Sequence, residues 1–186
     1  MNIALSVLTF IVAYIAGSIP SAVWAGKLFH GVDIREHGSG NAGATNTIRI
    51  LGWRTGIPVL AADILKGALA ALLPVLLKAA PAHSTQLLAL QIVCGMAAIT
   101  GHVFPLFAGF RGGKGVATAF GILLAIQPWA TLLCAAVFLT VLFISGYVSI
   151  ASLTAGVAFP VLIFTIYGSS PLLLRIFSVV VAVALI

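Results

Sequence analysis

The chain has 186 residues, of which 62% are hydrophobic and only 6% are charged, and its formal net charge is +6. A water-soluble domain of this size needs a far more charged surface, so the composition excludes one and indicates a protein that lies in a bilayer. The basic residues lie beside the ends of apolar runs and not in a stripe with aromatic residues, so we expect no nucleic-acid partner.

Seven apolar runs follow one another along the chain, and we expect each to be a membrane-spanning helix. They lack the two-residue alternation of barrel strands, and only helices or closed barrels pair every backbone amide in lipid. The predicted fold is therefore all-α, a polytopic bundle of about seven transmembrane helices in one domain over residues 1–186. The runs are approximately 3–26, 55–77, 84–107, three runs within 116–167, and one from Leu172 onward.

The second half of the chain contains an uncharged stretch over residues 115–174. At roughly 1.5 Å per residue it is long enough for about three crossings of a hydrocarbon core roughly 30 Å thick. Gly and Pro in series interrupt helices, so we place breaks at Gln127-Pro128, at Ser145-Gly146-Tyr147 and at 168–171. The fourth span, near 117–126, is then unusually short.

Basic residues at the ends of the spans divide unequally between the two sides of the membrane. If the spans alternate in direction, six fall on one side, whereas only Lys78 and Arg175 fall on the other. Because short cytoplasmic loops carry an excess of Lys and Arg, we predict that the larger group is cytoplasmic and the amino terminus periplasmic. The larger group is Lys27, Arg35, Arg49, Arg54, Arg111 and Lys114.

The first cytoplasmic loop contains the segment Gly38-Ser39-Gly40-Asn41-Ala42-Gly43-Ala44-Thr45-Asn46. Such a backbone can form a nest of N–H donors for a phosphate, and Ser39 lies where a helix amino terminus would meet an anion. If residues 41–49 are helical, then Asn41, Thr45 and Arg49 share one face. On this segment alone, a solvated turn with a helix cap is an equal alternative.

The next cytoplasmic loop places Lys114 among Gly112, Gly113 and Gly115. The glycines let backbone amides approach an anion closely while the lysine supplies a point charge. Gly115 stands where a Walker A loop needs Ser or Thr, which argues against that motif. The alternative for Lys114 and Arg111 is that they only mark the cytoplasmic side.

Other polar groups are few. His102 closes the third span and is either a candidate base or an interfacial histidine held by the backbone. Asp63 and Lys66 lie three residues apart inside the second span. Either they are functional groups, or they form an ion pair in which each neutralises the charge of the other. The break near Ser149 offers hydroxyls only. No catalytic triad or carboxylate pair is evident among three acids, so we expect no metal and no cofactor.

Three segments in this order resemble the bacterial PlsY-type acyl-phosphate:glycerol-3-phosphate acyltransferases. Segment 38–46 is similar to that family's first motif, Gly101-His102-x-Phe104-Pro105 through Gly112-Gly113-Lys114-Gly115-Val116-Ala117-Thr118 to its second, and Tyr147-x-Ser149-x-Ala151-Ser152 to its third. Asp63-x-x-Lys66-Gly67 also matches a family feature.

The resemblance implies a seven-helix enzyme of the bacterial inner membrane with a cytoplasmic-side site. Such an enzyme transfers a fatty acyl group from acyl phosphate to glycerol 3-phosphate, gives lysophosphatidic acid, and has a soluble partner that makes acyl phosphate. By residue, it implies phosphate contacts from Ser39, Asn41 and Thr45. It also implies phosphate binding by Arg49 and Lys114, and an acceptor pocket lined by Ser149.

For such a reaction we favour a substrate phosphate as the base, with Lys114 and the Ser39 loop stabilising the transition state and His102 as the second choice of base. A membrane transporter of phosphate or a phosphorylated solute is the competing interpretation.

Two departures from the family pattern affect the acceptor site. Family members carry a cytoplasmic His-Arg-x-Asn segment after the seventh span, whereas this sequence ends at Ile186. We therefore expect the acceptor contacts of that tail to be absent. Many members also have a basic residue where this chain has Gly146.

Overall fold

The computed structural model describes residues 3–166 and 171–185, and every regular element in these ranges is a helix. Of the predicted break at 168–171, residues 168–170 lie outside the described residues, and Pro171 directly precedes α9. The helices are α1 (Ile3–Gly17), α2 (Ser21–His30), η1 (Ile34–Glu36), α3 (Ala44–Leu51), α4 (Trp53–Leu76), α5 (Thr85–Val103), η2 (Leu106–Ala108), α6 (Val116–Ile126), α7 (Pro128–Ser145), α8 (Val148–Ile166) and α9 (Leu172–Leu185).

The predicted all-α bundle is confirmed. Five stretches are long and apolar enough to cross a membrane, and two shorter apolar helices, Val116–Ile126 and Leu172–Ala182, make up the other predicted spans. The short fourth span is also confirmed as α6, and the breaks after Ile126 and Ser145 fall where Pro128 begins α7 and where Gly146 ends it in a left-handed conformation.

Two local predictions need correction. The first run, expected as one helix over 3–26, is still one candidate span, Ile3–His30, but it consists of two helices separated by residues 18–20. Pro20 has no N–H to continue the hydrogen-bond ladder of α1. The helix considered over 41–49 begins only at Ala44. Asn41 therefore lies in the extended segment before α3, and only Thr45 and Arg49 share a helical face.

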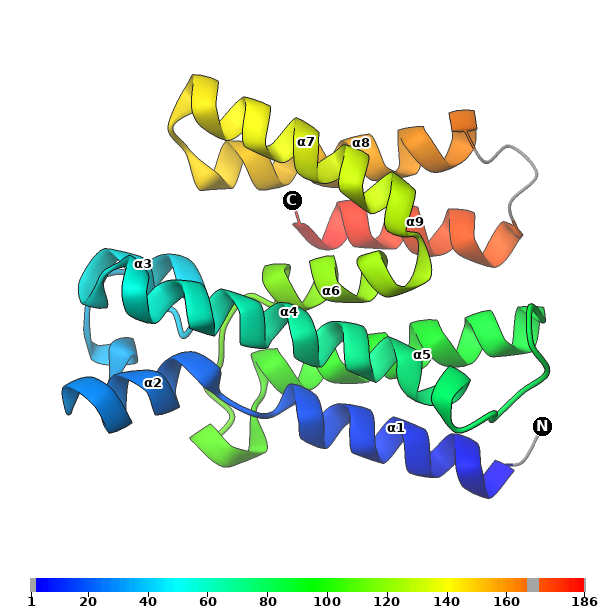
Figure 1. Cartoon of the computed structure of the whole chain (residues 1–186), viewed down its shortest axis with the longest axis horizontal. Coiled ribbons are helices and arrows are strands. Elements are labelled where there is room, and N and C mark those ends of the chain that lie inside the picture. The colour runs from blue at the N-terminus through cyan, green and yellow to red at the C-terminus, as the bar shows by residue number, and fades with distance from the viewer. Residues whose placement is uncertain (1–2, 167–170, 186) are drawn as a thin grey trace.

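α4 is the central helix and packs against α1, α2, α3, α5 and α6. Its closest neighbour is α6, because a Cβ atom on Gly121 would collide with the carbonyl of Ile64 and one on Gly67 with that of Thr118. Small residues of this kind allow helices to approach closely in lipid. α7, α8 and α9 form a second layer over α6 (Figure 1), and Ile122, Phe159 and Phe177 join both layers in one apolar core.

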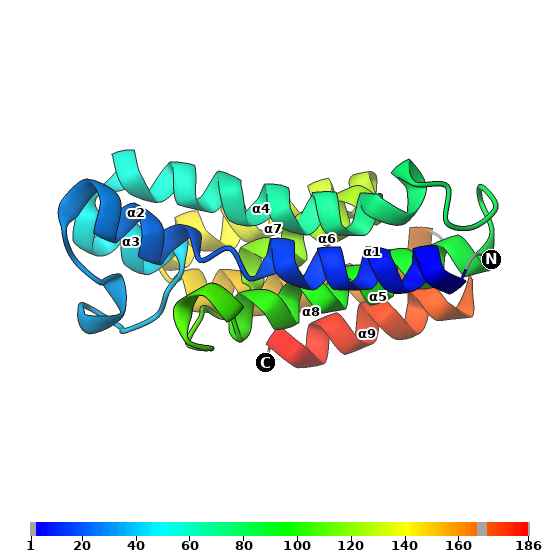
Figure 2. The ribbon, with the colours of Figure 1, turned by 90° about the horizontal axis from the view of Figure 1, so that it is seen from below.

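The two ends of the bundle carry different segments. Residues 31–43, 104–115 and 146–147 lie towards one end, whereas the first residues of α1 and segment 77–84 lie at the other (Figures 1 and 2). All three motif segments are therefore gathered on one side of the bundle, as the alternating spans predicted. The six basic residues of the larger group are in these segments or beside them.

Candidate active site

A buried polar cluster holds the break between α1 and α2. Lys66 Nζ donates to the carbonyl of Ile19 at 2.8 Å, and Ser21 Oγ donates to Asp63 Oδ1 at 3.0 Å. Lys66 and Asp63 form an ion pair at 2.9 Å, and their side chains are 7% and 2% exposed. The Lys66 cation thus lies beyond the carboxyl end of α1 and the Asp63 anion at the amino terminus of α2, as helix dipoles favour.

His102 connects this cluster to the second motif. Its Nδ1 lies 3.6 Å from Asp63 Oδ1 and makes no hydrogen bond with any described residue. Its Nε2 faces Gly113 so closely that a Cβ atom at that position would collide with it. Asp63 and Lys66 are recognisable as a pair in the sequence because both lie in the second span. His102 lies in the next span, and only the folded chain shows that it is their neighbour.

The first motif is organised from inside by Asn46, which is 1% exposed. Its Nδ2 donates to the carbonyls of Ile34 and His37, and its Oδ1 accepts a hydrogen bond from the backbone N–H of Ser39 at 3.0 Å. Asn46 therefore fixes the shape of the loop from beneath. The predicted residues that reach the surface of this loop are Gly38, Ser39, Gly40, Thr45 and Arg49, with Asn41 half-buried.

The second motif folds back onto the end of α5. The N–H groups of Gly112 and Gly113 donate to the carbonyls of Val103 and His102 at 3.0 and 3.2 Å. Gly115 then adopts a left-handed conformation with φ 77° and leads directly into α6. A side chain other than hydrogen is disfavoured there, so this glycine sets the direction in which the loop enters the helix.

The two motifs touch at Gly113 and Ala42. A Cβ atom on Gly113 would lie 2.8 Å from the carbonyl oxygen of Ala42, closer than two such atoms can approach. Trp24 of α2 and Phe107 of η2 add a ring contact with centroids 6.4 Å apart. The segment with Ser39 and the segment with Lys114 are thus neighbours, although the sequence separates them by a hydrophobic helix pair.

Charge at this end of the bundle is predominantly positive. Asp33 is paired with Lys27 and Arg35, and the Arg35 guanidinium in particular holds the pKa of that carboxyl well below its usual range. Lys114 and Arg49 are exposed, and neither forms a salt bridge within the described residues. Both cations are therefore available to an anionic ligand, as are Arg54 and Arg111, which are also exposed and form no salt bridge in that part of the chain.

Ser149 lies near the start of α8, and its side chain is exposed. The start of α8 is at the same end of the bundle as the two other motif segments (Figure 1). α8 packs against α7 and α9, so Ser149 belongs to the second layer. Among the residues that the structure describes, no group of three His, Cys, Asp or Glu side chains could hold a metal ion.

Comparison with known proteins identifies the family of this chain. Residues 7–186 match the family model of glycerol-3-phosphate acyltransferases. The chain belongs to this family. Glycerol-3-phosphate acyltransferases from Chlorobium phaeobacteroides and Chlorobaculum tepidum are 49% and 51% identical to it over 156 and 158 residues. These alignments cover 82% of this chain and 66% and 68% of the relatives, so the chain spans about two thirds of their length.

Solved structures of the family have the same fold. The crystal structure of PlsY (YgiH), an integral membrane glycerol 3-phosphate acyltransferase, in its glycerol 3-phosphate form superposes with a TM-score of 0.83 at 35% identity, over 97% of this chain and 86% of that one. The lysophosphatidic acid form gives 0.80 at 33% identity, over 97% and 85%. The resemblance found from the three motifs is therefore confirmed at the level of family and fold.

Proposed function

We propose that this chain transfers a fatty acyl group from acyl phosphate to glycerol 3-phosphate and releases lysophosphatidic acid and phosphate. The observation that carries the proposal is the contact between the two motif segments at Gly113 and Ala42, which brings the exposed Lys114 beside the Ser39 loop. Both substrates are anionic phosphates, and at this place exposed cations without a salt bridge among the described residues lie beside an exposed loop with a serine hydroxyl.

Residues of the two loops bind the substrate phosphates in different ways. Lys114 and Arg49 bind the substrate phosphates by charge, and the Ser39 and Thr45 hydroxyls and the Asn41 amide add hydrogen bonds. Gly38, Gly40, Gly112 and Gly113 belong to the proposed binding loops through their backbone. A Cβ atom on Gly38, Gly112 or Gly113 would collide with neighbouring protein atoms, so these glycines allow the loops to pack closely. Asn46 acts indirectly by fixing the N–H of Ser39. Ser149 lines the acceptor pocket from α8.

The chemistry requires little beyond placement and charge. The hydroxyl oxygen of glycerol 3-phosphate attacks the acyl carbon, the bond from that carbon to the phosphate oxygen breaks, and the phosphate leaves with the electron pair. The hydroxyl proton passes to a substrate phosphate, so the protein need not supply a base. Lys114 and the Ser39 loop stabilise the negative charge that develops in the transition state.

His102 contributes by position in this proposal. Its ring is 7% exposed and is enclosed between Asp63 and Gly113, so it supports the loop from within the bundle. That enclosure favours the substrate-phosphate base over His102, because a general base must lie within hydrogen-bond reach of the proton that it removes.

We further propose that the site faces the cytoplasm of a bacterium at its inner membrane, with the amino terminus in the periplasm. The six basic residues at the site's end of the bundle support this orientation. Single cysteines at His37, Tyr147 and Ala82, in a Cys94→Ser/Cys134→Ser background, test it in intact cells. The first two should be shielded from an impermeant reagent and the third labelled, and the opposite pattern would reject the orientation.

The activity is tested in vesicles that contain the purified protein. Labelled glycerol 3-phosphate and acyl phosphate should give labelled lysophosphatidic acid, whereas acyl-CoA or acyl carrier protein as donor should give none. Product formed from acyl-CoA but not from acyl phosphate would reject the proposed donor. Accumulation of solute inside the vesicles without product would instead support the competing transporter. A soluble enzyme that makes acyl phosphate is the partner that this donor requires.

A further inference from the structure

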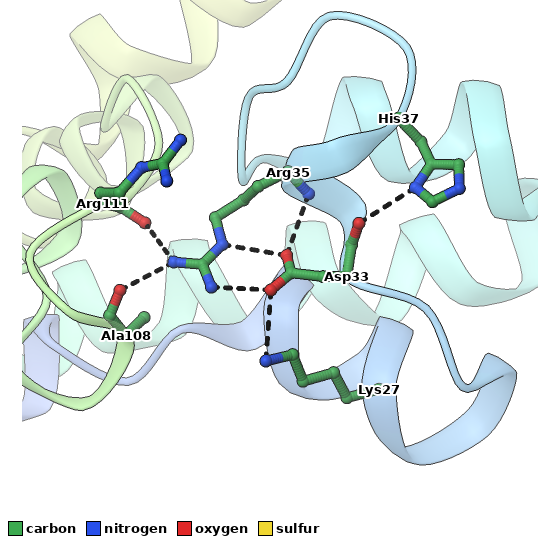
Figure 3. Close-up of polar contacts among 6 residues, drawn as sticks. All are labelled: Lys27, Asp33, Arg35, His37, Ala108 and Arg111. Atoms are coloured by element: carbon green, nitrogen blue, oxygen red, sulfur yellow. Dashed lines mark hydrogen bonds and ion pairs between the residues drawn. The ribbon is translucent and has the colours of Figure 1, made fainter.

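Arg35 joins the two motif segments through its guanidinium (Figure 3). Its Nη1 donates to the backbone carbonyls of Ala108 at 2.7 Å and Arg111 at 3.2 Å. Both acceptors lie in the second motif, 73 and 76 residues further along the chain. Arg35 itself lies in η1, four residues before Ser39.

Asp33 aims the Arg35 side chain at these carbonyls. The carboxylate accepts hydrogen bonds from Arg35 Nε at 2.9 Å and Nη2 at 2.7 Å, and one from the Arg35 backbone N–H at 3.1 Å. Such a fork of parallel bonds fixes the plane of a guanidinium, which leaves Nη1 directed at the second motif. Lys27 contacts the same carboxylate at 3.2 Å but does not reach the second motif (Figure 3).

The segment that Arg35 holds has few other supports on its outer side. Between Pro105 and Arg111 its backbone bonds are local turns, in which Ala108 and Phe110 donate to the Pro105 carbonyl and Arg111 to that of Ala108. Gly109 and Phe110 both have positive φ, at 62° and 58°. This conformation is strained at Phe110, because a bulky side chain disfavours positive φ. A cation that binds the Ala108 and Arg111 carbonyls stabilises this turn directly.

We propose that Arg35 is a positioning residue that holds the two phosphate-binding loops as one unit, so that Ser39 and Lys114 act on the same pair of substrates. This rests on the proposed acyl transfer. Arg35 is mostly buried, with 18% of its side chain exposed, and its bonds already engage every guanidinium nitrogen. It therefore acts through the loops and not by contact with a phosphate.

Arg35→Ala and Lys27→Ala form a matched pair, because each removes one cation from Asp33 and only Arg35 reaches the second motif. In vesicles, Arg35→Ala should lower kcat by about 30-fold to 100-fold, the loss that a small misplacement of catalytic groups produces, with KM for either substrate changed less than about 5-fold. Lys27→Ala should stay within about 3-fold of the parent. Arg35→Lys should recover only part of the loss, because an ammonium cannot bind Asp33 through two nitrogens and both carbonyls together.

A double-mutant cycle separates positioning from general support of the fold. If Arg35 acts by aligning the loop of Lys114, then Arg35→Ala should cost less than about 5-fold in a Lys114→Ala background, since residues in one network are not additive. Multiplicative losses would reject the proposal. So would equal losses in Arg35→Ala and Lys27→Ala, or a raised KM with unchanged kcat.

Hydrogen exchange tests the same contact without any turnover. In the detergent-solubilised protein, amides of residues 106–111 should exchange about 10-fold faster in Arg35→Ala than in the parent, because they form a locally opened unit, and should be unchanged in Lys27→Ala. Amides of α4 serve as the internal control for global unfolding. Equal exchange in Arg35→Ala and Lys27→Ala would reject the role of Arg35 in holding the two loops together. If exchange is faster in Arg35→Ala but the parent protein shows no acyl transfer, the role of Arg35 stands and the proposed function is rejected.

Discussion

Two aspartates organise this molecule, and they differ chiefly in their surroundings. Asp63 lies inside the bundle with Lys66, Ser21 and His102 around it, and its side chain is 2% exposed. Asp33 lies outside the spans with Lys27 and Arg35, and the side chains of Asp33, Lys27 and Arg35 are 12%, 55% and 18% exposed. The buried centre binds the two sides of the break that Pro20 makes in the first span, and the surface centre connects the two motif loops.

This difference predicts unequal sensitivity to mutation and to solvent. A buried charge that loses its partner cannot be hydrated. Removal of one residue of a buried ion pair therefore lowers the free energy of unfolding far more than removal of both. A partly exposed pair can be compensated by water and is screened by salt. We therefore expect the buried centre to control folding and the surface centre to control catalysis.

Asp63→Ala should have the largest effect on stability. It leaves the Lys66 ammonium buried without an anion, which costs about 3–5 kcal/mol. The unfolding midpoint in detergent should fall sharply. The double variant Asp63→Asn/Lys66→Met removes both charges and should lose much less. If the double variant is as unstable as Asp63→Ala, the pair is not what holds the break.

Asp33→Asn should have a smaller effect on stability, about 1 kcal/mol, because the site is partly hydrated. Its effect should be on turnover instead: kcat should fall about 10-fold as the Arg35 guanidinium loses its fixed plane. Thermal unfolding and initial rates on one preparation separate the two quantities. A loss of stability equal to that of Asp63→Ala would remove the distinction between the two centres.

The smallest expected effect is a pH dependence of the surface centre. Because the folded-state pKa of Asp33 is depressed by Arg35, its stabilising contribution is fully present above the unfolded-state pKa and is lost as pH falls below about 4. The difference in unfolding midpoint between the parent and Asp33→Asn should thus be constant from pH 8 to about pH 5 and shrink below that range. A difference that grows on acidification would contradict the assignment.

The sequence predicted the helices well because each is an uncharged run with Gly or Pro at its ends. It missed the break at residues 18–20 although Gly17 and Pro20 were visible in the run, because the composition on both sides is equally apolar. The motif residues were recognisable by their glycines and hydroxyls. The role of Arg35 could not be predicted, because its acceptors are backbone carbonyls 73 and 76 residues away. Every residue has a backbone carbonyl, so the sequence does not indicate which of them accept a hydrogen bond.

The central claim is that Lys114, at the junction of the two loops, stabilises the transition state of acyl transfer. Arg111 is the matched control, since its side chain is exposed and forms no salt bridge among the described residues. Its carbonyl, the group that Arg35 binds, survives substitution (Figure 3). In vesicles with acyl phosphate and glycerol 3-phosphate, Lys114→Ala should lower the rate by about 10²–10³, whereas Arg111→Ala should keep most of it. Lys114→Arg should recover only part. Equal losses in the two alanine variants, with both inserted normally, would show that the loop responds to total charge and would contradict this assignment.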